Sequence, residues 1–332
     1  MIFQENFNDA KDVFDQAHNL CQDDCPELKT KICIGIAECL YLQGEYVEGL
    51  KYLKTSPDKG KLSQDSKTRF LLVLSGHQIG MGMFSDAKLT LTELHATDHD
   101  LTIVLSKASR FIELGMFSEA KKILELQNTK DDEKTISDVD QAYLGAMLGY
   151  SLLAMDNEDE GFKLLHENVT ILEGLPSIKY GPELVDFHLY LAEAQLKRKN
   201  VTNASKHLQT AQKYVVQFFE MYLDHHPKFA KIITLFGLIR LETSDYEKAK
   251  INLQEALEMS KKLVKDESHQ PVGSFLVWIH QGLAEIAIKK DLDKAKAIDE
   301  NAKALEIAKI VFPEDSEFLT KQIKDFKKDL EA

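Results

Sequence analysis

Apolar residues recur at intervals of three and four along almost the whole chain, with charged residues between them. This is the period of an amphipathic α-helix, and no competing β period is present. Glycine, proline and short polar runs interrupt the pattern and mark the helix ends. The sequence predicts an all-α protein with helices over residues 7–22, 28–43, 46–55, 64–81, 84–95, 99–114, 117–127, 137–155, 158–173, 181–198, 201–224, 228–243, 246–265, 271–289, 292–311 and 314–330.

Two of these helices begin with nearly the same sequence, GMFSDAK at 82–88 and GMFSEAK at 115–121. Each contains an aromatic residue, two polar residues and then a small residue. The small residue recurs at intervals of 33–46 residues, which is typical of stacked helical hairpins. Its positions, the repeat markers, are Ala10, Gly49, Ala87, Ala120, Gly161, Ala204, Ala249 and Ala295.

A second set of small residues lies twelve positions before these markers. Six of its seven members are small, and the set is Ala37, Ser75, Ala108, Gly149, Ala192, Gly237 and Leu283. Small side chains at fixed places on two consecutive helices let the helix backbones approach closely. The two sets therefore predict where the two helices of each hairpin cross.

The small, aromatic and small residues at these positions resemble the tetratricopeptide repeat (TPR) family, most clearly at Gly237, Tyr246, Ala249 and Ala256. The segments 251–263 and 301–318 resemble the longer repeats of kinesin light chains. The resemblance implies a right-handed superhelical α-solenoid of about seven to eight TPR-like hairpins with a C-terminal capping helix. It also implies a concave face, lined by the first helix of each hairpin, that binds other proteins.

Interruptions of the pattern suggest how the array is divided. Residues 1–127 form N-terminal TPR-like repeats, and the polar residues 128–140 form a link or hinge. Residues 141–312 form longer TPR-like repeats, and residues 313–332 form a charged helix suited to capping the last hairpin.

Charge and hydropathy narrow the classes of partner. The chain has 332 residues and a formal net charge of −13, whereas nucleic-acid binding requires a basic surface, so we expect no nucleic-acid partner. No stretch approaches 18 uncharged apolar residues, so we expect no membrane span. The N-terminus lacks the features of a secretory signal, which leads us to expect a cytoplasmic protein.

Four residues are candidates for partner binding on the concave face. Glu38 and Glu193 stand where the resemblance to chaperone-binding TPR domains would require basic and amide residues, which argues against binding of a chaperone C-terminal tail. They favour a basic or neutral peptide, unless they are simply solvated charges. Trp278 and His280 share one helix and either contact a ligand or pack internally.

The N-terminal end of the array has no obvious capping helix before it. Phe3 and Phe7 lie at this end and are candidates for an interaction edge, with ordinary packing on the next helix as the alternative.

The sequence lacks the motifs of the common catalytic, metal and phosphate sites. Cys21, Cys25, Cys33 and Cys39 contain no Cys-x-x-Cys pair, so reduced buried thiols are favoured over zinc ligands. His95 and His99 are four residues apart but fall at a break between helices, which favours loop polarity over a metal site. We find no phosphate-binding loop and no nucleophile motif. We therefore predict no catalytic residue, metal or cofactor.

These observations predict a non-catalytic protein-interaction scaffold or adaptor that binds a peptide or helical segment of a partner protein, alone or as a subunit of a larger assembly. The alternative is a peptide-sensing regulator whose superhelix changes pitch when the ligand binds, with residues 126–140 as the hinge.

Overall fold

The structure is a computed structural model that describes residues 7–21, 25–56, 62–94, 100–128, 137–174, 181–219, 226–263, 274–312, 316–317 and 319–321. These residues form fifteen α-helices and no strand: α1 (Phe7–Leu20), α2 (Pro26–Leu42), α3 (Tyr46–Thr55), α4 (Gln64–Gly80), α5 (Phe84–Glu93), α6 (Leu101–Glu113), α7 (Phe117–Asn128), α8 (Asp138–Ala154), α9 (Glu158–Glu173), α10 (Gly181–Lys197), α11 (Val201–Phe219), α12 (Pro227–Glu242), α13 (Tyr246–Leu263), α14 (Ser274–Lys289) and α15 (Lys294–Val311). The predicted all-α fold is confirmed.

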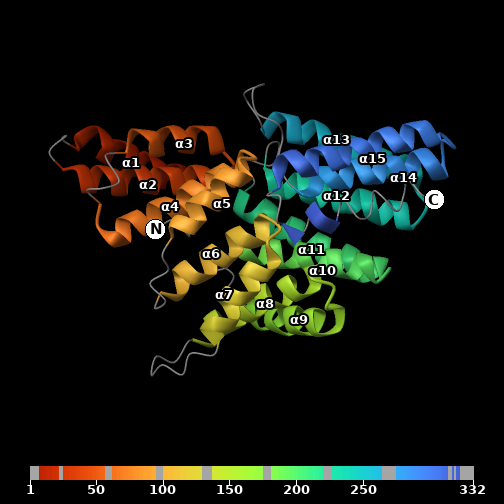
Figure 1. The fold of residues 1–332 in the computed structure, drawn as a ribbon, viewed down its shortest axis with the longest axis horizontal. Helices are drawn as coiled ribbons and strands as arrows, with labels where there is room; N and C mark the ends of the chain where they lie inside the picture. The colour runs from red at the N-terminus through yellow and green to blue at the C-terminus, as the bar shows by residue number, and fades with distance from the viewer. Residues whose placement is uncertain are drawn as a thin grey trace.

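Consecutive helices pack as antiparallel hairpins that stack in sequence order. The seven hairpins are α2–α3, α4–α5, α6–α7, α8–α9, α10–α11, α12–α13 and α14–α15, while α1 packs on α2 ahead of the first of them. In Figure 1 the hairpins follow a curved path from α1–α3 through α8 and α9 to α12–α15. This arrangement is the α-solenoid of stacked helical hairpins that the sequence predicts. The similarity of the later repeats to kinesin light chains stays a prediction.

Each hairpin turn contains one residue with positive φ, two positions before the second helix begins. In the first three hairpins it is Gly44, Gly82 or Gly115, with φ between 68° and 78°. Glycine adopts this conformation without steric cost, which explains the glycines between the predicted helices. In the other four hairpins the residue is Asp156, Lys199, Ser244 or Leu292.

The small residues lie where the two helices of a hairpin touch. A Cβ atom on Gly149 would lie 2.5 Å from the backbone nitrogen of Leu165 and 2.9 Å from the carbonyl oxygen of Gly161. The alanine markers of four other hairpins, Ala87, Ala120, Ala204 and Ala249, are completely buried. Larger side chains at these positions would push the two helices apart.

The repeat marker of the last hairpin is Ala297 and not Ala295. Ala295 is exposed, whereas Ala297 is 1% exposed and stands fourth in its helix, as the other markers do. The sequence prediction began this helix at residue 292, because Leu292 resembles the apolar residue of the repeat pattern. Leu292 instead lies in the turn and is 86% exposed, and the side chain of Asp293 caps α15 by accepting the N–H of Lys296.

The largest hydrophobic cluster joins the two ends of the array. It runs through the first five hairpins and also contains Phe312 and Leu319 from the C-terminal end. The predicted link 128–140 overlaps the last residue of α7 and the first three residues of α8, and its residues 129–136 are outside the described part. The two helices contribute Leu124 and Leu144 to this cluster. The division at the link stays a prediction. Most of the predicted capping helix 313–332 also lies outside the described residues.

Candidate functional site

The inner face of the superhelix contains a cavity of about 300 Å³. The first helices of all seven hairpins line it, together with the starts of α3, α5 and α7 and three residues that follow α15. Its aromatic residues are Tyr41, Tyr46, Phe84, Phe117, Tyr150, Tyr190, Phe275, Trp278 and Phe312. Aromatic walls with a few polar groups are typical of a site for a small ligand or a side chain of a peptide.

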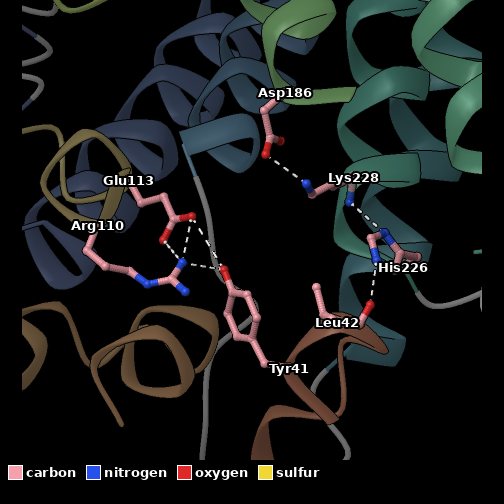
Figure 2. Close-up of polar contacts among 7 residues, drawn as sticks. All are labelled: Tyr41, Leu42, Arg110, Glu113, Asp186, His226 and Lys228. Carbon is pink, nitrogen blue, oxygen red and sulfur yellow. Dashed lines mark hydrogen bonds and ion pairs between the residues drawn. The ribbon is translucent and has the colours of Figure 1, made fainter. Parts of the chain in front are cut away.

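One side of the cavity is closed by a contact between the first hairpin and the sixth. The ring of His226 accepts the N–H of Lys228 at Nδ1 (3.3 Å), which leaves its Nε2–H to donate to the carbonyl of Leu42 (3.3 Å; Figure 2). Lys228 in turn pairs with Asp186 of α10 at 2.7 Å. Residues 42 and 226 thus meet although 184 positions separate them, so the superhelix closes on itself around the cavity.

A buried polar cluster joins α2 to α6 next to this closure. The guanidinium of Arg110 donates to the hydroxyl of Tyr41 (2.5 Å) and to Glu113 (3.0 Å), and it lies 4.4 Å from the centre of the Tyr41 ring (Figure 2). Burial opposes the charge of Arg110, but Glu113 and Tyr41 outweigh this effect and raise its pKa. The cluster therefore fixes Tyr41 and Glu113 in the cavity wall.

A second cluster forms another part of the cavity wall. The rings of Tyr150 and Tyr190 stack with their centres 3.5 Å apart, and burial raises the pKa of both phenols well above the ordinary value. Glu193 accepts a hydrogen bond from the Tyr150 hydroxyl (3.1 Å) and pairs with Lys231 (2.7 Å). The Lys231 ammonium also lies 5.3 Å from the ring of Trp278, within the range of a cation–π contact.

Charges in the cavity wall are balanced. The four acids are Glu113, Asp186, Glu193 and Glu317, and the four bases are Lys197, Lys228, Lys231 and Lys321. Each of the four acids is bonded to a cation, a hydroxyl group or a backbone N–H. The acidic groove that Glu38 and Glu193 suggested is therefore not what the described residues form.

The structure brings two of the predicted binding residues together and separates the other two from them. Glu193 and Trp278 both line the cavity, bridged by Lys231. Glu38 instead forms a two-pronged ion pair with Arg69, at 2.6 and 2.7 Å. His280 is bonded to Glu300 of α15 at 2.7 Å and does not line the cavity.

The candidate interaction edge falls mainly outside the described part of the chain. Phe3 lies in the residues that precede it, and Phe7 is the first residue of α1, with a side chain that is not described. His95 and His99 also lie outside it.

The sequence contains a signal for the cavity wall that the prediction did not use. Ile79, Ile112 and Leu153 all line the cavity, and each lies four residues after the small residue of its own first helix. Tyr150 and Glu193 lie one residue after that small residue, on the same helix face. The position of the small residue therefore indicates which residues of a first helix face the cavity. Tyr41, which lies four residues after Ala37, also follows this rule.

The described residues contain no cluster of three or more His, Cys, Asp or Glu side chains arranged to hold a metal ion. None of the helices in the described part is long and apolar enough to cross a membrane. Cys33 and Cys39 are buried free thiols, and burial raises the pKa of Cys39 to about 11.

No family and no curated protein matches this sequence. Among solved structures, the apo form of RapI is 14% identical, with a TM-score of 0.42, over 91% of this chain and 84% of RapI. A human IFIT1 dimer with m7Gppp-AAAA is 15% identical, with a TM-score of 0.30, over 98% of this chain and 85% of IFIT1. Yeast Tom70 is 13% identical, with a TM-score of 0.25, over 98% of this chain and 92% of Tom70. Because the identities are 13–15% and the TM-scores 0.25–0.42, none of these three solved structures indicates a ligand or partner for this chain.

Proposed function

We propose that this chain is a non-catalytic protein-interaction scaffold whose concave cavity binds a short peptide segment of a partner protein. The observation that carries the proposal is the aromatic cavity at the centre of a closed superhelix. Its volume of about 300 Å³ suits one or two side chains of a peptide rather than a whole helix.

The balance of charge supports a protein partner of mixed or neutral composition. Four acids and four lysines line the cavity, so its wall lacks the excess of positive charge that a phosphate backbone needs. We therefore propose a peptide ligand and no nucleic-acid partner. We also propose a cytosolic location, which the reduced thiols of Cys33 and Cys39 favour.

A library of displayed peptides, selected against the immobilised full-length protein, tests this function. Two variants that each add one tryptophan form a matched pair. Ala154→Trp places the new ring in the cavity, whereas Ile251→Trp places it on α13, where the native side chain is 60% exposed. We expect selected peptides to lose at least about tenfold in affinity for Ala154→Trp and to bind Ile251→Trp like the wild type. Peptides that bind all three proteins equally would contradict the proposal.

The closure of the superhelix favours a second candidate function, a peptide-sensing regulator. A ligand that needs more room than the cavity offers would separate Leu42 from His226 and open the superhelix. Small-angle X-ray scattering with and without a selected peptide distinguishes the two functions. A larger radius of gyration at saturation favours the regulator, and an unchanged one favours the scaffold.

A further inference from the structure

The residues that follow α15 fold back onto the first half of the array. Phe312, Ser316, Glu317, Leu319 and Lys321 are described there, and we call them the C-terminal contact residues. In Figure 1 the short blue stretch after α15 lies near the middle of the molecule. Ser316 is completely buried, and Phe312 and Leu319 are 3% and 4% exposed. These residues therefore occupy a binding surface of the chain itself.

The surface they cover is formed by three successive hairpin turns. The ring of Phe312 packs edge-on against Phe84, the first residue of α5, with ring centres 5.0 Å apart. Glu317 contacts the first turn of α7, and Lys321 pairs with Asp156 in the turn between α8 and α9 at 2.8 Å. We call this surface, made by Phe84, Phe117, Ser118 and Asp156, the hairpin-turn edge. Phe312, Glu317 and Lys321 contact the three hairpins in chain order, with one contact for each hairpin.

The carboxylate of Glu317 makes the most specific of these contacts. It accepts the backbone N–H groups of Phe117 (3.0 Å) and Ser118 (3.1 Å), and it also accepts the hydroxyl of Ser118. The first N–H groups of a helix have no partner within the helix, and the helix dipole favours a negative charge there. Met116, which precedes α7, has no side chain that could cap them. Glu317 supplies this cap from 200 residues away.

The polar contacts of the segment are accessible to a competitor. Ser118 is exposed, and the side chains of Lys321 and Asp156 are 41% and 67% exposed. Exposed ion pairs contribute little to stability. Phe312, Glu317 and Lys321 also line the cavity, so the segment closes part of the site to which the proposed function assigns the ligand.

We propose that the hairpin-turn edge is a docking surface for a partner segment, and that the C-terminal contact residues occupy it as an intramolecular competitor. The fitting partner segment carries an aromatic residue, a carboxylate five positions later and a basic residue four positions after that, the spacing of Phe312, Glu317 and Lys321. This inference rests on the proposed peptide-binding function. It adds the sequence pattern of the partner segment and the competition by the C-terminal contact residues, which restricts access of the partner to the hairpin-turn edge.

The test uses a fluorescein-labelled peptide with the sequence of residues 309–322 and four full-length proteins, compared by fluorescence anisotropy. Glu317→Ala releases the C-terminal segment and leaves the edge open. Ser118→Glu also releases it, because its carboxylate repels Glu317, but it blocks the edge for the peptide as well. Glu306→Ala changes an exposed acid of α15 as a matched control. We expect Glu317→Ala to bind the peptide at least about tenfold more tightly than the wild type, Glu306→Ala to bind like the wild type, and Ser118→Glu not to bind.

Hydrogen exchange gives a second measurement on the same proteins. We expect the amides of residues 316–321 to exchange faster in Glu317→Ala and Ser118→Glu than in the wild type. Equal peptide affinity for wild type and Glu317→Ala, peptide binding by Ser118→Glu, or no binding by a folded Glu317→Ala would each overturn the inference. These outcomes leave the cavity experiment with Ala154→Trp unaffected, so the two proposals can fail separately.

Discussion

Acidification from pH 7 to pH 5 is expected to destabilise this protein in part through the buried histidine His77. His77 is a residue of α4 and its ring is completely buried against α2. Its Nε2–H donates to the carbonyl of Ala37 at 2.9 Å. Nδ1 has no hydrogen-bond partner among the described atoms. A second proton on Nδ1 would place a charge in this site close to Arg110. Burial, partly offset by the bond to Ala37, lowers the pKa of His77 to about 4.

The direction and size of the effect follow from proton linkage. In the unfolded chain the pKa of a histidine is about 6.5, so between pH 6.5 and pH 4 the unfolded state binds more protons than the folded state. Stability therefore falls as the pH falls through this window. A fall of the His77 pKa from about 6.5 to about 4 corresponds to a loss of about 3 kcal/mol below pH 4, of which about 2 kcal/mol is lost between pH 7 and pH 5.

Urea unfolding at pH 7 and pH 5, followed by circular dichroism, measures this loss. In His77→Gln the amide still donates to Ala37 but does not titrate, so we expect this variant to lose about 2 kcal/mol less than the wild type on acidification. Lys54→Gln, which changes an exposed side chain of α3 and removes no histidine, serves as the control and should behave like the wild type. If His77→Gln and the wild type lose the same free energy of unfolding, the ring of His77 is not responsible and the argument is wrong.

Three further predictions concern stability. Ala249→Leu should lower the free energy of unfolding in urea by about 1–3 kcal/mol, because Ala249 is fully buried between α12 and α13. If the variant is as stable as the wild type, the repeat register that places Ala249 at the helix crossing is wrong. Leu292→Gly should gain about 0.5–1 kcal/mol by relieving a φ of 53° at an exposed site, whereas Leu292→Ala should gain nothing. Glu183→Gln should raise Tm at pH 7, because burial raises the pKa of Glu183 and its Oε2 is unpaired. The gain in Tm should vanish below about pH 4.5, where Glu183 is protonated in both the folded and the unfolded state. A gain at every pH would point to another cause.

The sequence predicted the local structure closely because helices and hairpins follow from short-range patterns. The predicted helix 158–173 agrees with α9, and 46–55 agrees with α3. The glycines at 44, 82 and 115 mark turns whose backbone needs positive φ. The prediction was wrong at Ala295. Leu292 in the turn fits the apolar position of the repeat pattern, so the predicted marker lies two residues before the observed one, Ala297.

The candidate site was predicted only in part. Glu193 and Trp278 were found because they lie on first helices, whose concave face the family resemblance implies. Glu38 was predicted to bind a partner on the concave face, but it does not line the cavity and pairs with Arg69 of the neighbouring hairpin, a contact that the sequence pattern does not indicate. The aromatic residues Tyr150 and Tyr190 look like ordinary core residues until the curvature of the array places them in one cavity.

The sequence by itself determined the helices, their pairing into hairpins and the small residues where they cross, because each depends on residues at most a few tens of positions apart. Only the tertiary structure decided the contacts of Arg110 with Tyr41, of His226 with Leu42 and of Glu317 with Phe117, which span 69, 184 and 200 positions. The path of a superhelix is the sum of small rotations between successive hairpins. Whether its ends meet, and what they enclose, depends on the packing of all the hairpins together and not on the pattern within any one.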